Sequence, residues 1–247
     1  MSEIPDGLVA LRDVLSLKEI ASLIERTARW VSPEAFQLLP VWFPERSRKG
    51  LLYRGNWSEP QMNKNQITGQ SVHKSEANVY ASKALTLALG LNSKSRPNWS
   101  CCHIWSIDDP TYQLSNVVVR DGRFFSCIGN MVLLPTPLKA FTDTMPEIKA
   151  MLRICAHNLY GWKCDHDNLL ASNEELENWN DWGSYPDSWP KTPQEKKPLG
   201  VTELTPSIRA SVQKRKAQIL HDLENAGENS PRDEVRKALD YWKIVLK

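Results

Sequence analysis

Two short stretches decide how this sequence folds: CCHIW at residues 101–105 and GNMVLLP at residues 129–135. Each combines a polar side chain with an apolar run of strand length, and each run ends at a turn signal, Asp-Asp-Pro in the first case and a proline in the second. The pattern predicts strands over 99–107 and 131–134. His103 lies within the first strand, and Asn130 comes directly before the second.

The residues between and after these two strands predict further elements. NVVVRDGRFFSCI at 116–128 has two extended runs around Asp121-Gly122, which is a hairpin signal. A short helix is expected over 136–142. Thr144 with Glu147 has the spacing of a capping box, and we expect it to open a helix that ends near Gly161.

The flanking segments read mainly as helices. A capping box of Ser16 with Glu19 opens an apolar stripe over 16–31, and Ser32-Pro33 is typical of a helix start. Further helices are expected over 75–89, 207–224 and 230–245. We predict an α+β protein in four parts: a helical, DNA-contacting region (1–97), a core (98–163), an acidic connector rich in Trp and Pro whose Trp residues dock on the body (164–205), and a C-terminal helical pair (206–247).

Composition narrows the class of protein. The chain has 247 residues, of which 41% are hydrophobic and 24% charged, which is an ordinary globular mixture. Residues 61–163 carry 11 Lys and Arg against 6 Asp and Glu, and this net charge of +5 suits a polyanionic partner.

We find no apolar run of membrane-spanning length and no signal-peptide layout, and the five cysteines are odd in number. We therefore expect a cytoplasmic protein, no membrane partner, and cysteines that are free thiols or metal ligands.

The order of His103, a long hairpin, Asn130-MVLLP and a short helix resembles the HNH nuclease family, whose fold is the ββα-metal finger. CHI stands where that family has DHI or HHI, and NMVLL stands where it has NLVLL. The resemblance covers about residues 98–145 and lacks the flanking CxxC zinc pairs. It implies a ββα-metal finger core within a mainly helical protein, and a DNA endonuclease, of restriction or another defence role, that needs a divalent ion such as Mg²⁺, Mn²⁺ or Zn²⁺.

The resemblance also implies residue roles. His103 would be the general base that activates water, and Asn130 would hold the imidazole or its loop through its side-chain amide. Because one such site cuts one strand, cleavage of both strands would need a homodimer, which the C-terminal helices could form.

The expected metal ligands depart from the family pattern. Cys102 stands where the family has Asp or His, and a thiolate favours soft ions. Nine residues after Asn130 comes Lys139, which cannot coordinate while it is protonated, although it could bind phosphate. One turn further, Asp143 is the expected ligand, with Asp108 and Asp109 in reserve.

A second basic stretch, WFPERSRKGLLYRGNW at 42–57, interleaves cations with aromatic residues. It could follow a phosphate backbone and stack on a base, or it could be a solvated loop anchored by its aromatic side chains. The expected DNA contacts are Arg46, Arg48, Lys49, Arg54 and, on the core, Lys139. The run Lys214-Arg215-Lys216 could likewise contact phosphate or form a solvated helix face.

Two alternatives to an endonuclease remain open. The chain could be a non-catalytic nucleic-acid-binding or interaction protein that keeps the finger as a scaffold, or a structural zinc protein. A zinc site of Cys155, His157, Cys164 and His166 is disfavoured, because side chains two residues apart on a helix point to different faces.

Overall fold

The computed structural model describes residues 4, 6–48, 50–92, 94, 96–106 and 116–246. Contacts within the chain define two compact units. Unit 1 comprises residues 1–30, 98–115 and 131–202, and unit 2 comprises residues 31–97, 116–130 and 203–247. Helices accompany a two-stranded sheet in each unit, which confirms the α+β class. The division into four sequence segments stays a prediction.

The sheet of unit 1 is an antiparallel pair of β3 (Trp99–His103) and β4 (Met131–Pro135). The pairing places His103 opposite Met131, so β4 begins where β3 ends. The side chains of residues 131–134 are all buried, which explains why this strand is a continuous apolar run without polar alternation. Both predicted strands are confirmed, although β3 ends at His103, earlier than expected.

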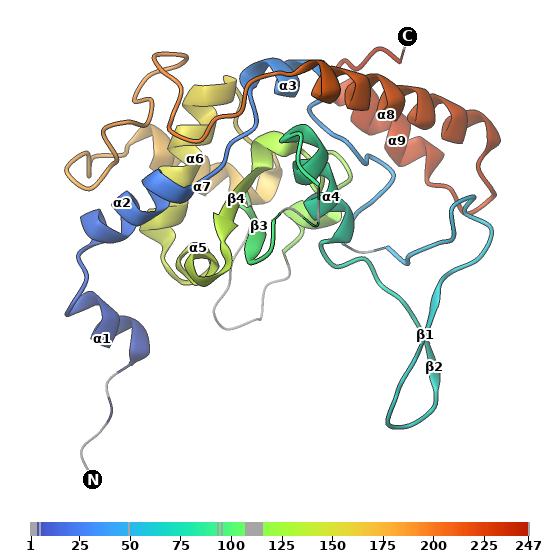
Figure 1. Cartoon of the computed structure of the whole chain (residues 1–247), viewed down its shortest axis with the longest axis horizontal. Coiled ribbons are helices and arrows are strands. Elements are labelled where there is room, and N and C mark those ends of the chain that lie inside the picture. Colours follow the sequence, from blue (N-terminus) through green and yellow to red (C-terminus); the bar gives the residue numbers. More distant parts are fainter. Residues whose placement is uncertain are drawn as a thin grey trace. The chain divides into compact units, whose positions relative to one another are not determined.

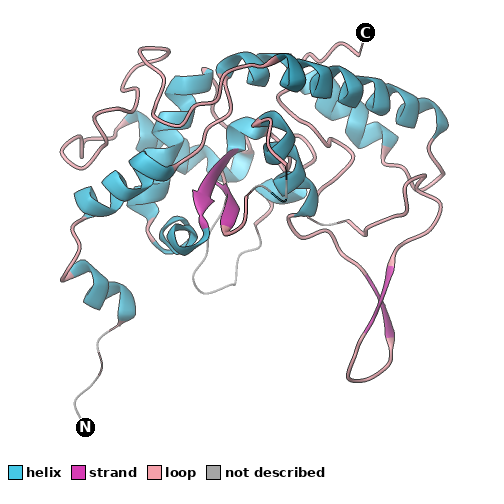
Figure 2. Ribbon diagram, viewed as in Figure 1, coloured by secondary structure: helices cyan, strands magenta, loops and turns pink. Residues whose placement is uncertain are grey.

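Helices make up most of the rest of unit 1 (Figures 1 and 2). They are α1 (Gly7–Arg12), α2 (Leu17–Thr27), α5 (Lys139–Thr144), α6 (Pro146–Tyr160) and α7 (Leu170–Glu177), with 3₁₀ turns η4 (Thr136–Leu138) and η5 (Asp167–Leu169). The capping box at the start of α2 is confirmed, because the side chains of Ser16 and Glu19 each bond the other residue's backbone N–H. Gly161 ends α6 in the left-handed conformation, with φ of 65°.

The second predicted capping box is wrong. Thr144 ends α5 instead of opening a helix, and its hydroxyl donates back to the carbonyl oxygen of Ala140 at 2.7 Å. The next helix starts at Pro146, which suits a first-turn position because it needs no N–H partner. Glu147 is engaged elsewhere, since it accepts from the Arg12 guanidinium at 2.9 Å.

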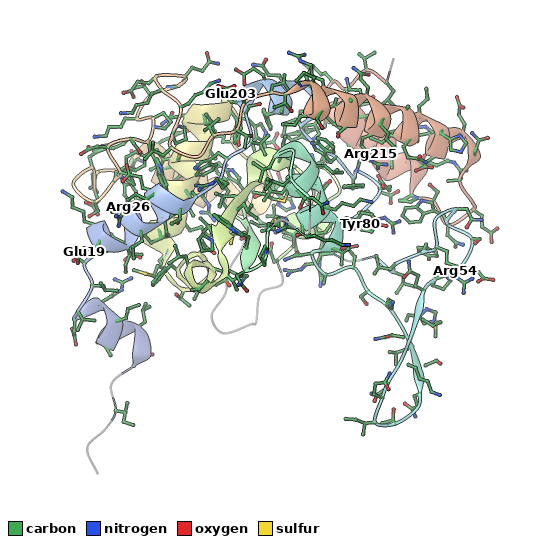
Figure 3. All side chains as sticks on the ribbon, in the orientation of Figure 1. Glu19, Arg26, Arg54, Tyr80, Glu203 and Arg215 are labelled. Carbon is green, nitrogen blue, oxygen red and sulfur yellow. The ribbon has the colours of Figure 1, made fainter. Side chains whose placement is uncertain are left out.

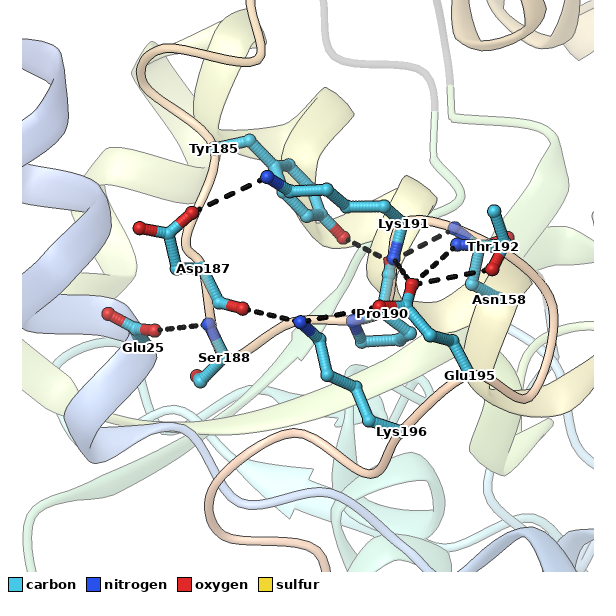
Figure 4. A network of polar contacts seen from close by, with 10 residues as sticks. All are labelled: Glu25, Asn158, Tyr185, Asp187, Ser188, Pro190, Lys191, Thr192, Glu195 and Lys196. Atoms are coloured by element: carbon cyan, nitrogen blue, oxygen red, sulfur yellow. Dashed lines mark hydrogen bonds and ion pairs between the residues drawn. The ribbon is translucent and has the colours of Figure 1, made fainter.

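The acidic connector is well anchored within unit 1. Trp189 is 1% exposed and meets Trp30 edge to face, with ring centroids 5.9 Å apart. Figure 4 shows the polar contacts beside it: the Asn158 amide and the Tyr185 hydroxyl both donate to the carbonyl oxygen of Pro190, at 3.0 and 2.9 Å. The expected docking of connector tryptophans is confirmed for Trp189, whereas Trp182 is 39% exposed.

Unit 2 is a helical unit with a narrow sheet. Its elements are α3 (Pro33–Leu38), β1 (Met62–Lys64), β2 (Ser71–His73), α4 (Val79–Ala88), η2 (Val118–Arg120), η3 (Ile128–Asn130), α8 (Pro206–Asn225) and α9 (Arg232–Tyr241). Helix α8 contacts α3 and α4. It packs against α9 through a cluster of Ile219, Val235 and Leu239.

The predicted hairpin over 116–128 is wrong. These residues form η2 and a series of turns, in which Asp121 Oδ1 accepts from the Arg123 N–H at 2.8 Å. Consecutive apolar residues such as Phe124 and Phe125 are both fully buried. In a hairpin, consecutive side chains would instead point to opposite faces. Gly122 allows the backbone to pass close to Pro44, because a Cβ at position 122 would lie 2.6 Å from the Pro44 carbonyl oxygen.

Candidate functional site

His103 is the last residue of β3 and is half-buried. It directly follows Cys102, and successive side chains of a strand point to opposite faces. Cys102 is turned toward α5, because its thiol interacts with the Thr142 hydroxyl and with the charges of Lys139 and Asp143. The imidazole and the thiol therefore occupy opposite faces of the end of β3.

The Cys102 thiol is 3% exposed, and its Sγ lies 3.8 Å from the carbonyl oxygen of Ser100. Burial raises the pKa of this thiol to about 11, although the Thr142 hydrogen bond and the Lys139 ammonium act in the opposite direction. The side chain is therefore a neutral thiol at physiological pH.

Helix α5 carries the other two expected groups. Lys139 and Asp143 lie one turn apart and form an ion pair, with side chains 41% and 50% exposed. The structure thus brings Cys102 and Asp143, two of the expected metal ligands, together with Lys139, the expected phosphate contact. Cys102 is a neutral thiol there, and the Lys139 ammonium is bound to the Asp143 carboxylate.

As they stand, these side chains do not form a preformed site for a divalent ion. A cation at Asp143 would have to displace the Lys139 ammonium, and it would also have to displace the proton of the Cys102 thiol. Within the described ranges, no three His, Cys, Asp or Glu side chains are grouped so that they could hold a metal. Asp108 and Asp109, the reserve ligands, lie outside those ranges.

Two buried cations of α6 support the chain just after His103, and the sequence reasoning missed them. The Lys149 ammonium donates to Ser106 Oγ at 2.5 Å, and Arg153 donates to the carbonyl oxygens of Ile104 and Ser106 at 2.7 and 3.0 Å. Lys149 is 5% exposed and Arg153 is 8% exposed. The available signal was their spacing of four residues among the apolar positions of a predicted helix.

Burial and the neighbouring Arg153 lower the pKa of Lys149 to about 7. We expect Lys149→Met to remove a pH dependence of stability. Between about pH 7 and the ordinary lysine pKa near 10, the unfolded chain binds more protons than the folded protein, so the unfolding free energy of the wild type rises with pH. The unfolding free energy of the wild type should rise, relative to that of Lys149→Met, by at most about 1.4 kcal/mol per pH unit.

Urea unfolding at about pH 7 and about pH 8.5 measures this slope. The exposed Lys18 provides the control, because Lys18→Met should leave the wild-type slope unchanged. Equal slopes for the wild type and Lys149→Met would show that the Lys149 ammonium remains charged in the folded protein.

Asn130 belongs to unit 2 and is fully buried. Its Nδ2 donates to the carbonyl oxygen of Phe124 at 3.1 Å, and its backbone N–H donates to Cys127 at 3.0 Å. The amide therefore pins the segment that leads into β4, and its expected role toward the imidazole stays a prediction.

The basic stretch of unit 2 divides into buried and exposed cations. Arg46 is 7% exposed and lies between two rings, with its guanidinium carbon 4.1 Å from the centroid of Trp57 and 4.3 Å from that of Tyr80. It therefore does not present its charge to a duplex. Arg48 is exposed, and Arg54, labelled in Figure 3, forms a solvent-exposed pair with Glu59 at 3.6 Å. Lys49 lies outside the described residues.

Two further cysteines lie in the interior of unit 1. Cys155 and Cys164 are fully buried, neither forms a disulfide bond, and burial raises the pKa of Cys155. Both side chains therefore behave as small apolar residues.

Comparisons of this chain with protein-family models, with curated proteins and with solved structures find no match in any of the three. Among the helices of the described residues, we find none that combines the length and the apolar character needed to cross a bilayer.

Proposed function

We propose that this chain is an endonuclease of the HNH type that hydrolyses phosphodiester bonds in DNA, with β3, β4 and α5 as its ββα unit. The observation that carries the proposal is the pairing of β3 with β4. His103 lies opposite Met131, Asn130 directly precedes that residue in the chain, and a helix follows β4 after one short turn. This is the order of elements that the resemblance requires.

In this proposal His103 is the general base. Imidazole suits the role because histidine titrates near neutrality and can take a proton from water. Arg153 holds the backbone just after it and Lys149 binds the Ser106 side chain, which supports a defined position for the imidazole. Asn130 is a positioning residue, since its amide holds the segment before β4.

Lys139 supplies positive charge in this proposal. Its side chain is partly exposed on α5, and an ammonium can neutralise charge that develops on a phosphate oxygen. A divalent ion would serve the same purpose if it displaced Lys139 from Asp143. If the proposed enzyme uses an ion, Asp143 remains the expected ligand, with Cys102 or the reserve residue Asp108 as a second one.

Supercoiled plasmid tests the proposal directly. We expect the wild-type protein to convert it to the nicked form, and to the linear form if two copies act together. Parallel reactions with Mg²⁺, Mn²⁺, Zn²⁺ or a chelator establish whether an ion is required. Plasmid that stays supercoiled under all four conditions, in the presence of protein that binds it, would contradict the endonuclease proposal.

A non-catalytic nucleic-acid-binding protein is the second candidate function. The observation in its favour is the state of the expected metal positions, where Lys139 pairs with Asp143 and Cys102 is a neutral thiol. Binding of DNA without any cleavage would support this candidate.

A further inference from the structure

The sheet of unit 2 is a free-standing ribbon. Strands β1 and β2 pair antiparallel, with Met62 opposite His73, and a turn of six residues joins them. Every residue from 62 to 73 is exposed, so both faces of the ribbon are open to solvent. Figures 1 and 2 show the two strands as a narrow arm leading away from α4. We call residues 60–75 the β1–β2 ribbon.

The base of the ribbon is held firmly. Leu52 donates its backbone N–H to Lys74 at 2.9 Å, Lys74 donates to Gln61 at 2.9 Å, and Gln61 donates to Leu52 at 2.6 Å. The ribbon therefore leaves unit 2 in a defined direction. A two-stranded ribbon with no apolar face buried is only marginally stable alone in water, so these bonds at its base contribute to its stability.

The tip of the ribbon is built to present one apolar side chain. The Asn65 carboxamide oxygen accepts from the backbone N–H groups of Ile67 and Thr68, at 2.8 and 3.1 Å. Gly69 completes the turn with φ of 71°. The result is Ile67 at 95% exposure, at the furthest point of a turn stabilised by its own side chains.

The chemistry of the ribbon points to a polyanion with polar base edges. The 16 residues from Pro60 to Ser75 contain no Asp or Glu, and they include Lys64 and Lys74. Besides Asn65, which is engaged in the turn, three exposed amide side chains accompany the charges: Asn63, Gln66 and Gln70. Asn and Gln side chains pair with adenine in the major groove, and apolar side chains contact the thymine methyl group there.

We infer that the β1–β2 ribbon is a DNA-binding arm that enters the major groove of a duplex. Two paired strands lie about 4.8 Å apart, which with their side chains fits a groove about 12 Å wide but not the minor groove of about 6 Å. Lys64 and Lys74 would contact phosphates, and Ile67 would reach the base edges. The choice of DNA as the ligand rests on the proposed function.

Binding of a fluorescent duplex of about 25 base pairs tests the inference, measured by anisotropy in a His103→Ala background so that the duplex is not cut. We expect the double variant Lys64→Ala/Lys74→Ala to bind about tenfold more weakly at about 0.1 M salt, and its salt slope to fall by about 2. The matched control is Arg236→Ala/Lys237→Ala, which removes the same charge from exposed positions of α9 in the same unit and should bind within about twofold of the parent.

Two further measurements test whether the ribbon lies in the major groove. Replacing thymine by uracil removes the major-groove methyl group, and this should weaken binding by the parent protein but not by Ile67→Ala. Methyl green, a major-groove ligand, should compete with the protein, whereas netropsin, a minor-groove ligand, should not. Circular dichroism and the thermal midpoint should match the parent for all variants, because the substituted side chains are largely solvent-exposed.

Unchanged binding by the ribbon variants would overturn the inference even if the protein cleaves plasmid. Competition by netropsin alone would overturn the choice of groove. Ribbon-dependent binding by a protein that never cleaves would leave the inference standing and overturn only the endonuclease proposal.

Discussion

Replacing His103 by alanine is expected to lower the single-turnover rate of DNA cleavage by about 10²–10⁴-fold, the contribution of a positioned general base. The rate falls because water must then lose its proton without an acceptor held by the end of β3. The affinity for DNA should stay within about twofold, since the expected DNA contacts are elsewhere, on α5 and in unit 2. Gel analysis of plasmid cleaved at saturating protein measures the rate, and anisotropy measures the affinity.

Chemical rescue separates a base from a merely structural histidine. Free imidazole added to His103→Ala should restore part of the cleavage rate, because a small base can enter the space left by the side chain. The exposed His221 on α8 provides the control, and His221→Ala should cleave like the wild type. Wild-type cleavage by His103→Ala would remove His103 from the proposed mechanism and leave the fold of unit 1 unaffected.

Replacing Arg215 by alanine is expected to destabilise the protein by about 3–5 kcal/mol, the cost of leaving a buried charge without its partner. The Arg215 guanidinium donates to both carboxylate oxygens of Glu45 at 2.6 Å and to the carbonyl oxygen of Trp42 at 2.5 Å. The two charged side chains are 9% and 10% exposed, and the guanidinium carbon lies 4.4 Å from the Phe43 ring centroid. Urea unfolding measures the loss.

The neighbouring Lys214 provides a matched control. It belongs to the same basic run on α8 but is exposed, so Lys214→Ala should change the unfolding free energy by less than about 0.5 kcal/mol. The double variant Glu45→Gln/Arg215→Met should recover part of the loss, because it removes both charges together. A cost below about 1 kcal/mol for Arg215→Ala would show that Glu45 is solvated without its partner.

Local signals in the sequence located most elements of the fold. The start of α2 follows from the side chains of Ser16 and Glu19, which bond within one helical turn. Strand β4 follows from four consecutive apolar residues between a glycine-asparagine pair and a proline. These features were predictable because the interactions that produce them join residues only a few positions apart.

The same kind of local reasoning failed where tertiary contacts outweighed it. Asp121-Gly122 has the composition of a hairpin turn, but most of the apolar residues around it are buried and the chain turns repeatedly to bury them. Thr144 and Glu147 have the spacing of a capping box, but Arg12, 135 residues before Glu147, holds that carboxylate instead.

The candidate site, like the fold, could be predicted from the sequence only in part. The sequence located His103 at a strand end and Asn130 before the next strand, and it indicated that Lys139 cannot be a metal ligand while it is protonated. It did not indicate that Lys139 would pair with Asp143 or that Cys102 would be a neutral buried thiol. The protonation state of a thiol depends on what surrounds it in space.

The sequence by itself therefore determined the α+β class, the two strands of unit 1, most helix starts and the position of His103. Only the tertiary structure decided which cations are surface charges and which are structural. Lys149 is buried against Ser106, 43 residues away, and Arg215 against Glu45, 170 residues away, while Lys64 and Lys74 stand on an open ribbon. The physical reason is that burial, and with it the free energy of a charge, is set by contacts between distant segments, which no local pattern of residues encodes.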